Sequence, residues 1–170
     1  MTLTLADQYF IKAMDEYPYC LEETIENLNY ALSYEDEHAG ANCLMGKVYL
    51  EQFQNFELAE EYFIKAMATD PFDLRTCENY MRLMIRTKRY QEAIKLLQFT
   101  KDLTGVDLAL LLKIEAEICE LKHEFDRAIS LLKEAIGESL DSEDIYSLRQ
   151  QIARVKMKSE LQSEVKYSLY

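Results

Sequence analysis

A chain of 170 residues is long enough to bury the core of one domain and too short for two domains of ordinary size. Its formal net charge of −12 disfavours general binding to nucleic-acid phosphates, and no apolar run reaches the roughly 18 residues that a membrane span needs. The acidic excess is uneven: residues 1–71 contain 14 acidic and 3 basic side chains, whereas residues 72–170 contain 17 and 16. The acidic half is compatible with a basic partner and also with solubility alone.

The N-terminal segment MTLTLADQYF has no basic stretch followed by an apolar core, so no signal peptide is expected and we predict a cytoplasmic protein. Cysteines occur singly, without CxxC spacing, at Cys20, Cys43, Cys77 and Cys119. They are expected to be small, reduced core residues and not a disulfide framework.

Apolar residues recur at three- and four-residue steps along nearly the whole chain, which is the period of an α-helix. In chain order the pattern predicts nine helices, over residues 4–17, 20–34, 39–53, 56–69, 73–87, 90–103, 107–121, 124–137 and 142–160. Short connections between helices of this length are typical of an antiparallel array, so the predicted fold class is all-α, with no sheet.

Several connections carry residues that end or begin helices. Asp70 should end one, because the following Pro71 pushes it out of the α region. Gly105 and Gly137 stand where a left-handed C-cap is expected. The expected N-cap residues are Asp107, Asp141 and Ser142.

Two segments share a hexapeptide. Residues 6–18 read ADQYFIKAMDEYP and residues 59–71 read AEEYFIKAMATDP, so YFIKAM occurs twice, 53 residues apart. A looser repeat has a shorter period. ELAEEYF at 57–63 aligns with QEAIKLL at 91–97 after 34 residues, and QEAIKLL aligns with DRAISLL at 126–132 after 35.

At this period the chain resembles the tetratricopeptide repeat (TPR) family, whose 34-residue helix–turn–helix unit has the pattern WxxLGxxY…AxxxF…P. The best unit is LMGKVYLEQFQNFELAEEYFIKAMATDP, which carries one extra residue in the turn and lacks the tryptophan. Its matching residues are Met45, Gly46, Tyr49, Ala59, Phe63, Ala66 and Pro71. Small residues such as Gly46 and Ala59 let two helices approach, and large residues fill the space around them.

The resemblance covers roughly residues 19–140 and implies a right-handed α-solenoid of antiparallel helix hairpins, a TPR-like superhelix, with a C-terminal capping helix. The spacing of 53 is one repeat plus about half a repeat, so residues 4–17 carry a second-helix sequence in a first-helix position. We predict a single domain over residues 1–170, with hairpins at about 4–34, 39–69, 73–103 and 107–137 and a capping helix at about 142–160. In the alternative, helix 4–17 packs irregularly.

No residues with catalytic spacing stand out, so we expect neither an enzyme nor a cofactor. The glycines are too far apart for a phosphate-binding loop. Cys119 and His123 are four residues apart, but structural zinc needs four ligands and none assembles locally. We therefore expect His38 and His123 to be turn residues and predict no metal site.

Polar residues mark a candidate binding face. Arg75, Asn79, Arg82 and Arg86 follow steps of four, three and four, which places them on one stripe of a helix. In the TPR family the first helix of each hairpin lines a concave groove, and its ligand-facing positions fall on these four residues and Glu78. Corresponding positions in the neighbouring repeats are Cys43, Lys47 and Glu51, and Lys113 and Glu117. The predicted peptide-binding residues are Lys47, Arg75, Glu78, Asn79, Arg82, Arg86, Lys113 and Glu117.

Guanidinium groups in a concavity favour carboxylates or phosphates through charge-assisted hydrogen bonds. The alternative is a solvated face on which the arginines pair with Glu78 and Glu117. Some TPR proteins clamp the C-terminal carboxylate of chaperone peptides. That clamp is not expected here, because the earlier first helix lacks a KxxxN motif and the neighbouring repeats lack a matching asparagine.

The resemblance implies a non-enzymatic, cytoplasmic protein-interaction scaffold, or adaptor, which binds an extended or helical peptide of a partner in its groove. A second hypothesis is a chaperone for a secreted or assembling protein, since small acidic TPR proteins of this length resemble such chaperones. A third is an assembly subunit that forms a homodimer through helix 4–17 or the C-terminal helix. The expected partner is a protein or peptide with acidic or carboxylate groups, and neither nucleic acid nor a membrane.

Overall fold

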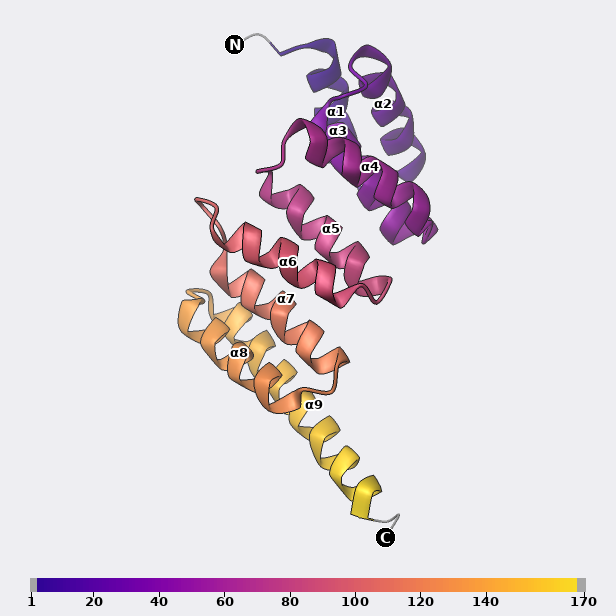
Figure 1. Ribbon diagram of the computed structural model, residues 1–170. Coiled ribbons are helices and arrows are strands. Elements are labelled where there is room, and N and C mark those ends of the chain that lie inside the picture. The colour runs from indigo at the N-terminus through magenta and orange to yellow at the C-terminus, as the bar shows by residue number, and fades with distance from the viewer. Residues whose placement is uncertain (1–2, 168–170) are drawn as a thin grey trace. The chain divides into compact units, whose positions relative to one another are not determined.

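The computed structural model describes residues 3–167, and side chains as far as residue 163. These residues form helices and short connections, with no strand among them (Figure 1). The elements are α1 (Leu5–Glu16), α2 (Leu21–Tyr34), α3 (Ala39–Val48), the π-helix η1 (Tyr49–Phe53), α4 (Phe56–Thr69), α5 (Leu74–Arg86), α6 (Tyr90–Lys101), α7 (Leu108–Leu121), α8 (Phe125–Glu138) and α9 (Ser142–Tyr167). The predicted all-α class is confirmed, and the last helix runs further than the predicted residue 160. None of the described helices has the length and apolar character required to cross a membrane.

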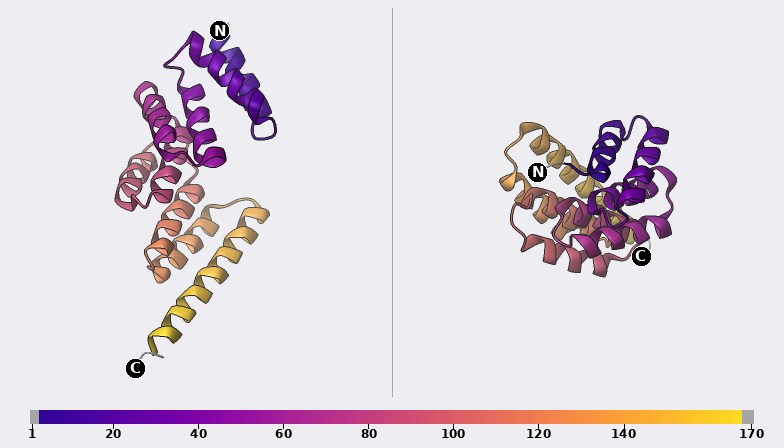
Figure 2. Two further views of the ribbon diagram at one scale, coloured as in Figure 1. Left: turned by 90° about the vertical axis from the view of Figure 1, so that its right-hand side faces the viewer. Right: turned by 90° about the horizontal axis from the view of Figure 1, so that it is seen from above.

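The chain divides into two compact units, Met1–Leu96 and Leu97–Tyr170. Consecutive helices pack as antiparallel pairs (Figure 2). In the first unit α1 pairs with α2, and α3 pairs with α4. In the second unit α7 pairs with α8, and α9 packs on α8 after this pair. Helix α1 therefore pairs with its neighbour in sequence, and it also contacts α3.

The turns within three successive pairs have the same backbone geometry. Gln54, Lys88 and His123 have positive φ angles of 52°, 61° and 62°, which are uncommon for residues other than glycine. After two of these residues an N–H group reaches back to close the helix end: Arg89 donates to the carbonyl of Met84 and Glu124 to that of Cys119, both at 2.8 Å. The three left-handed residues lie 34 and 35 residues apart, so the period of the sequence is also a period of the backbone.

The extra residue of the best-matching repeat lies in the last turn of its first helix. Tyr49–Phe53 forms a π-helical turn, which holds one residue more than an α-turn. The N–H groups of Gln54 and Asn55 both bond to the carbonyl of Tyr49, the latter at 3.0 Å. The helix thus widens, and the connection that follows stays short.

Several helix ends follow the predicted signals. Asp70 is extended at the end of α4, and Gly105 has a φ of +79°. The carboxylate of Asp107 accepts the N–H of Leu110 at 2.9 Å at the start of α7.

Two of the expected caps differ in the structure. Gly137 lies inside the last turn of α8 without a positive φ, because the helix continues to Glu138 and ends in the extended Ser139. The prediction of a left-handed cap at Gly137 was therefore wrong. At the next helix Asp141 is the cap, since its carboxylate accepts the N–H of Glu143 at 2.7 Å, and Ser142 is the first helical residue.

In the first unit, two glycines of α3 allow aromatic rings to approach its backbone. A Cβ atom at Gly46 would lie 2.7 Å from the ring of Phe63, and one at Gly40 would lie 2.7 Å from the ring of Phe10. These phenylalanines belong to the two YFIKAM segments, so α3 contacts both of them. Ala59, expected at a helix crossing, is fully buried.

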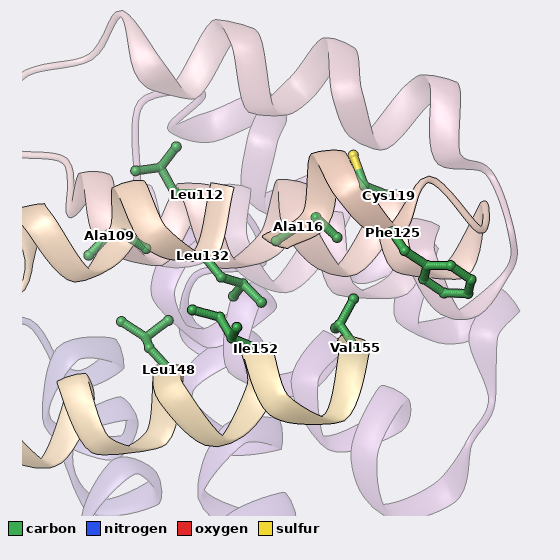
Figure 3. Packing of buried hydrophobic residues seen from close by; sticks show 11 residues of the cluster. Ala109, Leu112, Ala116, Cys119, Phe125, Leu132, Leu148, Ile152 and Val155 are labelled. Carbon is green, nitrogen blue, oxygen red and sulfur yellow. The ribbon is translucent and has the colours of Figure 1, made fainter. Parts of the chain in front are cut away.

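In the second unit, α9 covers one apolar face of the pair α7–α8. Its residues Leu148, Ile152 and Val155 point toward α7 and α8 (Figure 3). Outside this core, Glu120 of α7 is buried and receives Arg154 at 2.8 Å and Lys158 at 2.6 Å, both from α9. The predicted capping helix is thus fixed by apolar packing and by two ion pairs.

Candidate functional site

A hollow of about 310 Å³ opens on the first unit, between residues of α1, α3 and α5. Its lining residues are Phe10, Met14, Gly40, Cys43, Leu44, Lys47, Glu51, Asp73, Arg75, Glu78, Asn79 and Arg82. Below, these twelve residues are called the groove. The volume is at the lower end of the range, about 300–1,000 Å³, that is usual for ligand pockets.

Five of the eight predicted peptide-binding residues lie in the groove. Arg75, Glu78, Asn79 and Arg82 come from α5, where their three- and four-residue spacing turns them to one side. The carboxylate of Asp73 starts this helix by accepting the N–H of Thr76 at 2.9 Å. The fifth, Lys47, comes from α3.

The other three predicted residues are not among those that line the groove. The guanidinium of Arg86 lies over the ring of Phe56 in α4, at 5.8 Å from its centroid. Lys113 belongs to the second unit, where its ammonium is 3.8 Å from the carboxylate of Asp144 in α9. Glu117 is an exposed residue of α7, also in the second unit.

The two groove arginines both have acidic neighbours. Arg82 directs Nε and a terminal nitrogen to one oxygen of Glu78, at 3.1 and 2.8 Å. Arg75 is 3.6 Å from the carboxylate of Asp73. Because the side chain of Arg82 is 43% exposed, its pair with Glu78 is of the surface kind, which contributes about 0–1 kcal/mol to stability. A carboxylate from a ligand can therefore compete for these arginines at little cost to the fold.

Lys47 lies beside an aromatic ring. Its ammonium lies 5.4 Å from the centroid of the Tyr17 ring. The hydroxyl of Tyr17 donates to Glu51, one helical turn after Lys47. Burial, with this hydrogen bond second, raises the pKa of the Tyr17 phenol to about 12. The groove cation Lys47 therefore lies beside a neutral phenol, and the carboxylate of Glu51 lines the same end of the groove.

Helix α1 contributes an apolar wall that the sequence did not assign to the site. Phe10 and Met14 line the groove, and the sulfur of Met14 is 4.0 Å from a guanidinium nitrogen of Arg75. Leu44 of α3 adds a third apolar side chain. One feature of the sequence could have indicated this wall: residues 4–17 carry a second-helix sequence in a first-helix position. In the structure the phenylalanine of that sequence, Phe10, lies against Gly40 of α3.

The cysteine in the groove is not arranged as a nucleophile. Cys43 is buried, and the amide nitrogen of Asn79 points to its sulfur at 3.6 Å. Burial raises the pKa of the Cys43 thiol, so the unreactive protonated form dominates at neutral pH.

The chain is similar to known proteins in its structure and not in its sequence. No protein-family model matches the sequence, and no curated protein matches it either. PilW, a widely conserved type IV pilus biogenesis factor, superposes with a TM-score of 0.81 at 16% identity, over 98% of this chain and 75% of its own. PilF of Pseudomonas aeruginosa gives a TM-score of 0.79 at 19% identity, over 92% of this chain and 69% of its own. A tetratricopeptide repeat protein from Parabacteroides merdae gives a TM-score of 0.73 at 19% identity, and the superposition covers 96% of this chain and 63% of that protein. The chain has the tetratricopeptide repeat fold.

The groove follows the first helices of the antiparallel pairs. The groove of this chain is built from α1, α3 and α5, and α1 and α3 are the first helices of their antiparallel pairs. The hollow thus lies along the first helices of these two pairs, although α1 has the sequence of a second helix.

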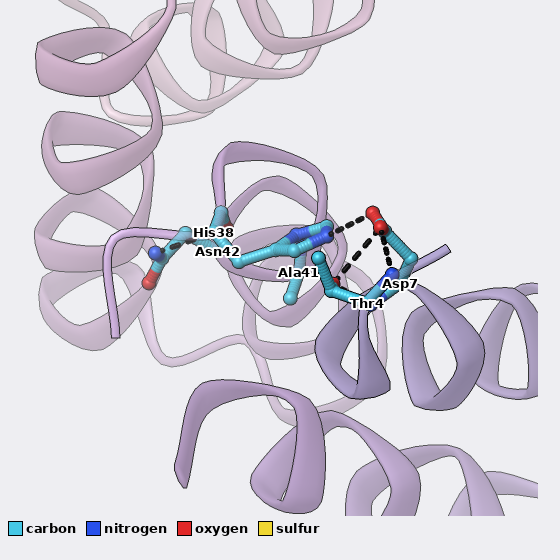
Figure 4. Close-up of polar contacts among 5 residues, drawn as sticks. All are labelled: Thr4, Asp7, His38, Ala41 and Asn42. Atoms are coloured by element: carbon cyan, nitrogen blue, oxygen red, sulfur yellow. Dashed lines mark hydrogen bonds and ion pairs between the residues drawn. The ribbon is translucent and has the colours of Figure 1, made fainter. Parts of the chain in front are cut away.

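His38 connects the first two TPR hairpins at one edge (Figure 4). Its Nδ1 accepts the N–H of Ala41 at 3.0 Å and so caps α3, and its Nε2 lies 3.3 Å from the carboxylate of Asp7 in α1. In the neutral ring the proton is therefore on Nε2, which donates to Asp7. Hydrogen bonds from Thr4, with that from His38 next, hold the pKa of Asp7 below its usual value. The turn histidine expected from the sequence thus has a capping role.

The described residues contain no cluster of three or more His, Cys, Asp or Glu side chains suited to a metal ion. Cys119 is buried, whereas His123 is exposed, with its ring edge-on to Phe125 at 5.6 Å. Nearby Glu115 binds Lys101 at 2.8 Å and Arg127 at 2.9 Å. Glu115 is therefore engaged in ion pairs and Cys119 is enclosed in the core, so neither is arranged with His123 to bind a metal ion.

Proposed function

We propose that the chain is a non-enzymatic interaction scaffold whose groove holds an extended peptide segment of a partner protein. The observation that carries this proposal is the groove itself: first helices of the TPR fold place three cations and an apolar wall around one hollow. Rigid helices present these side chains, so little ordering cost on binding falls on the scaffold.

The groove favours a peptide with a carboxylate next to an apolar side chain. Phe10, Met14 and Leu44 provide apolar surface on one side. Lys47 on α3 and Arg75 on α5 provide cations within the same hollow, and charge-assisted bonds to carboxylates are the strong interactions that such groups make. The acidic residues of the groove, which include Glu51 and Glu78, add a requirement of their own: a purely acidic peptide would be repelled. We therefore expect a peptide of mixed character, with one or two acidic groups.

Selection of peptides from a random library tests this function with no need for the natural partner. The parent chain is compared with a groove variant that carries Lys47→Ala, Arg75→Ala and Arg82→Ala. A control variant carries Lys65→Ala, Lys88→Ala and Lys95→Ala, which remove three exposed cations elsewhere and change the net charge equally. Peptides with an acidic residue beside an apolar one should be enriched on the parent and the control.

Calorimetric titration of the enriched peptides then gives their affinities. The groove variant should bind them at least tenfold more weakly, and salt should weaken binding to the parent because part of the attraction is screened over about 8–10 Å. Equal affinity for parent and groove variant, or no enrichment at all, contradicts the proposal. Arg86→Ala should have a smaller effect than Arg82→Ala, since Arg86 lies over Phe56 and outside the groove.

A second candidate function is assistance in the assembly of a secreted or surface structure. The structural likeness to PilW, a type IV pilus biogenesis factor, favours it. In cells that lack the chain, such a role predicts loss of an assembled or secreted protein, and the groove variant should fail to restore it. A scaffold without this role leaves secreted proteins unchanged.

A further inference from the structure

His38 lies where α1, the start of α3 and the wall of the groove meet. Its ring packs on Phe10, with ring centroids 5.1 Å apart. Phe10 lies against Gly40, and both of these residues line the groove. The side chain of His38 is only 11% exposed, so its ring cannot turn without a change in its neighbours. A change at His38 therefore reaches the groove through two of its lining residues.

The two ring nitrogens of His38 have different tasks, and the ring lies between α3 and Asp7 (Figure 4). Nδ1 accepts the N–H of Ala41 at 3.0 Å, and this bond caps the first turn of α3, which includes Gly40. Nε2 lies 3.3 Å from the carboxylate of Asp7 and donates to it. The cap requires a neutral ring, because only an unprotonated ring nitrogen accepts a hydrogen bond.

Uptake of one proton is incompatible with this cap. Both ring nitrogens then carry an N–H, so the N–H groups of Nδ1 and Ala41 point at each other across the 3.0 Å between their nitrogens. The positive charge also lies at the N-terminus of α3, where the helix dipole disfavours cations. The protonated ring therefore turns away from Ala41 and keeps its bond to Asp7.

The charged groups around His38 come from three parts of the first unit. They are Asp7 of α1, the exposed Glu35, Asp36 and Glu37 of the preceding connection, and Asp73 and Arg75 at the start of α5, which line the groove with Gly40. Asp7 contacts the ring directly. Hydrogen bonds from Thr4, with that from His38 next, hold the pKa of Asp7 below its usual value. The carboxylate is therefore ionised between about pH 5 and 8, the range in which histidines titrate, and it retains the imidazolium.

We propose that His38 is a pH-sensitive switch of the groove: the neutral ring caps α3 and supports Phe10, and protonation removes both supports and weakens peptide binding. Gly40 lies in the turn that loses its cap, and Phe10 loses the ring on which it packs. Binding is thus strong at neutral pH and falls as pH drops through the histidine range. In its effect on binding the inference rests on the proposed function, whereas the change at α3 and Phe10 does not.

Nuclear magnetic resonance of the whole chain between pH 5 and 8 tests the switch without a ligand. As the ring of His38 becomes protonated, cross-peaks between the rings of His38 and Phe10 should disappear. Exchange of the Ala41 N–H with solvent should become at least tenfold faster than in His38→Asn at the same pH. Asparagine is a good N-cap residue that accepts the same N–H and does not titrate in this range. Persistent ring contacts with equal exchange, or a His38 ring that stays neutral down to pH 5, overturn the proposal.

His123→Asn is the matched control for these measurements. His123 is the other histidine of the chain and belongs to the second unit. Its φ of 62° is a conformation that asparagine adopts more readily than most residues, so the turn should be retained. This variant should show the same loss of ring contacts and the same faster exchange at Ala41 as the parent.

The effect on binding is measured with the peptides selected on the parent, by calorimetric titration at pH 7.5 and pH 5.5. The parent and His123→Asn should bind at least fivefold more weakly at pH 5.5, whereas His38→Asn should change little. Asp7→Asn removes the charge that retains the imidazolium, so the loss of affinity should move to lower pH. An equal loss in the parent and His38→Asn overturns the switch while the groove still binds peptide. Failure to select any peptide contradicts the proposed function alone, and the exchange of the Ala41 N–H then decides the switch.

Discussion

The same six residues, YFIKAM, lie in two different surroundings. In α4 the phenylalanine is Phe63, which is fully buried against Gly46 of α3. In α1 it is Phe10, which is half-buried against Gly40 and lines the groove. Helix α4 packs on both α3 and α5, whereas α1 packs mainly on α2. One sequence thus gives the same helix twice, and the neighbouring helices decide whether its aromatic face becomes closed core or lines the groove.

Other contacts of the hexapeptide are shared by the two copies. Tyr62 stacks on Tyr49 with ring centroids 5.6 Å apart, and Tyr9 stacks on Tyr34 at 5.9 Å. A lysine three residues after each tyrosine lies over its ring, at 5.3 Å and 5.1 Å. The lysine contact follows from the three-residue spacing within one helix, so it recurs in both copies. The stacking tyrosine comes from the preceding element in the second copy and from the following helix in the first.

The largest difference between the copies should appear on truncation of the phenylalanines. Phe63→Ala leaves a cavity in a closed core and should lower the free energy of unfolding by about 3–5 kcal/mol. Phe10→Ala removes a ring that is only half-buried, so its effect should be clearly smaller. Urea unfolding followed by circular dichroism measures both. Equal losses would show that α1 is as enclosed as α4.

A smaller difference is expected at the two glycines. Gly46→Ala forces a methyl group against the buried ring of Phe63 and should cost about 1–3 kcal/mol. Gly40→Ala meets the half-buried ring of Phe10, which can swing toward the groove, so the loss should be under half as large. Thermal unfolding of the two variants checks this. A larger loss at Gly40 than at Gly46 contradicts the comparison.

The methionines that end the two hexapeptides should differ in binding. Met14 lines the groove, so Met14→Ala should weaken the peptides selected on the parent about tenfold, equivalent to about 1.4 kcal/mol. Met67, on the corresponding side of α4, is half-buried and does not line the groove, so Met67→Ala should leave affinity unchanged while lowering stability. Fluorescence anisotropy with a labelled peptide measures the affinities. An identical affinity for parent and Met14→Ala removes α1 from the site.

The smallest effect concerns the residue that follows the first copy. The raised pKa of Tyr17, about 12 against 10.0 for a free phenol, means that folding stabilises its neutral form. This stabilisation is fully present below pH 10 and is lost as pH rises from about 10 to 12. Comparison of Tyr17→Phe with the parent in alkaline unfolding should show a shallower loss for the variant. If the stability of parent and variant fell with pH along parallel curves, ionisation of the Tyr17 phenol would not be coupled to unfolding.

Much of the fold could be predicted from the sequence, because it depends on local spacing. The three- and four-residue steps of apolar side chains predicted the helices, and the 34- and 35-residue intervals matched the recurrence of left-handed turns at Gln54, Lys88 and His123. Arg75, Glu78, Asn79 and Arg82 could be placed on one face of α5 for the same reason. The left-handed cap expected at Gly137 failed because helix α8 continues through it, and a glycine alone does not end a helix that tertiary packing extends.

The sequence by itself determined the helices, their period and which residues of each helix share a face, since these follow from the 3.6-residue turn. Only the tertiary structure decided which faces meet. It brought Phe10 and Met14 of α1 to the groove, put Lys47 beside Tyr17, and paired Lys113 with Asp144 in the other unit. It also left one side of α9 exposed. The physical reason is that contacts between helices distant in sequence depend on the volume and shape of all their side chains together, and no local pattern records that sum.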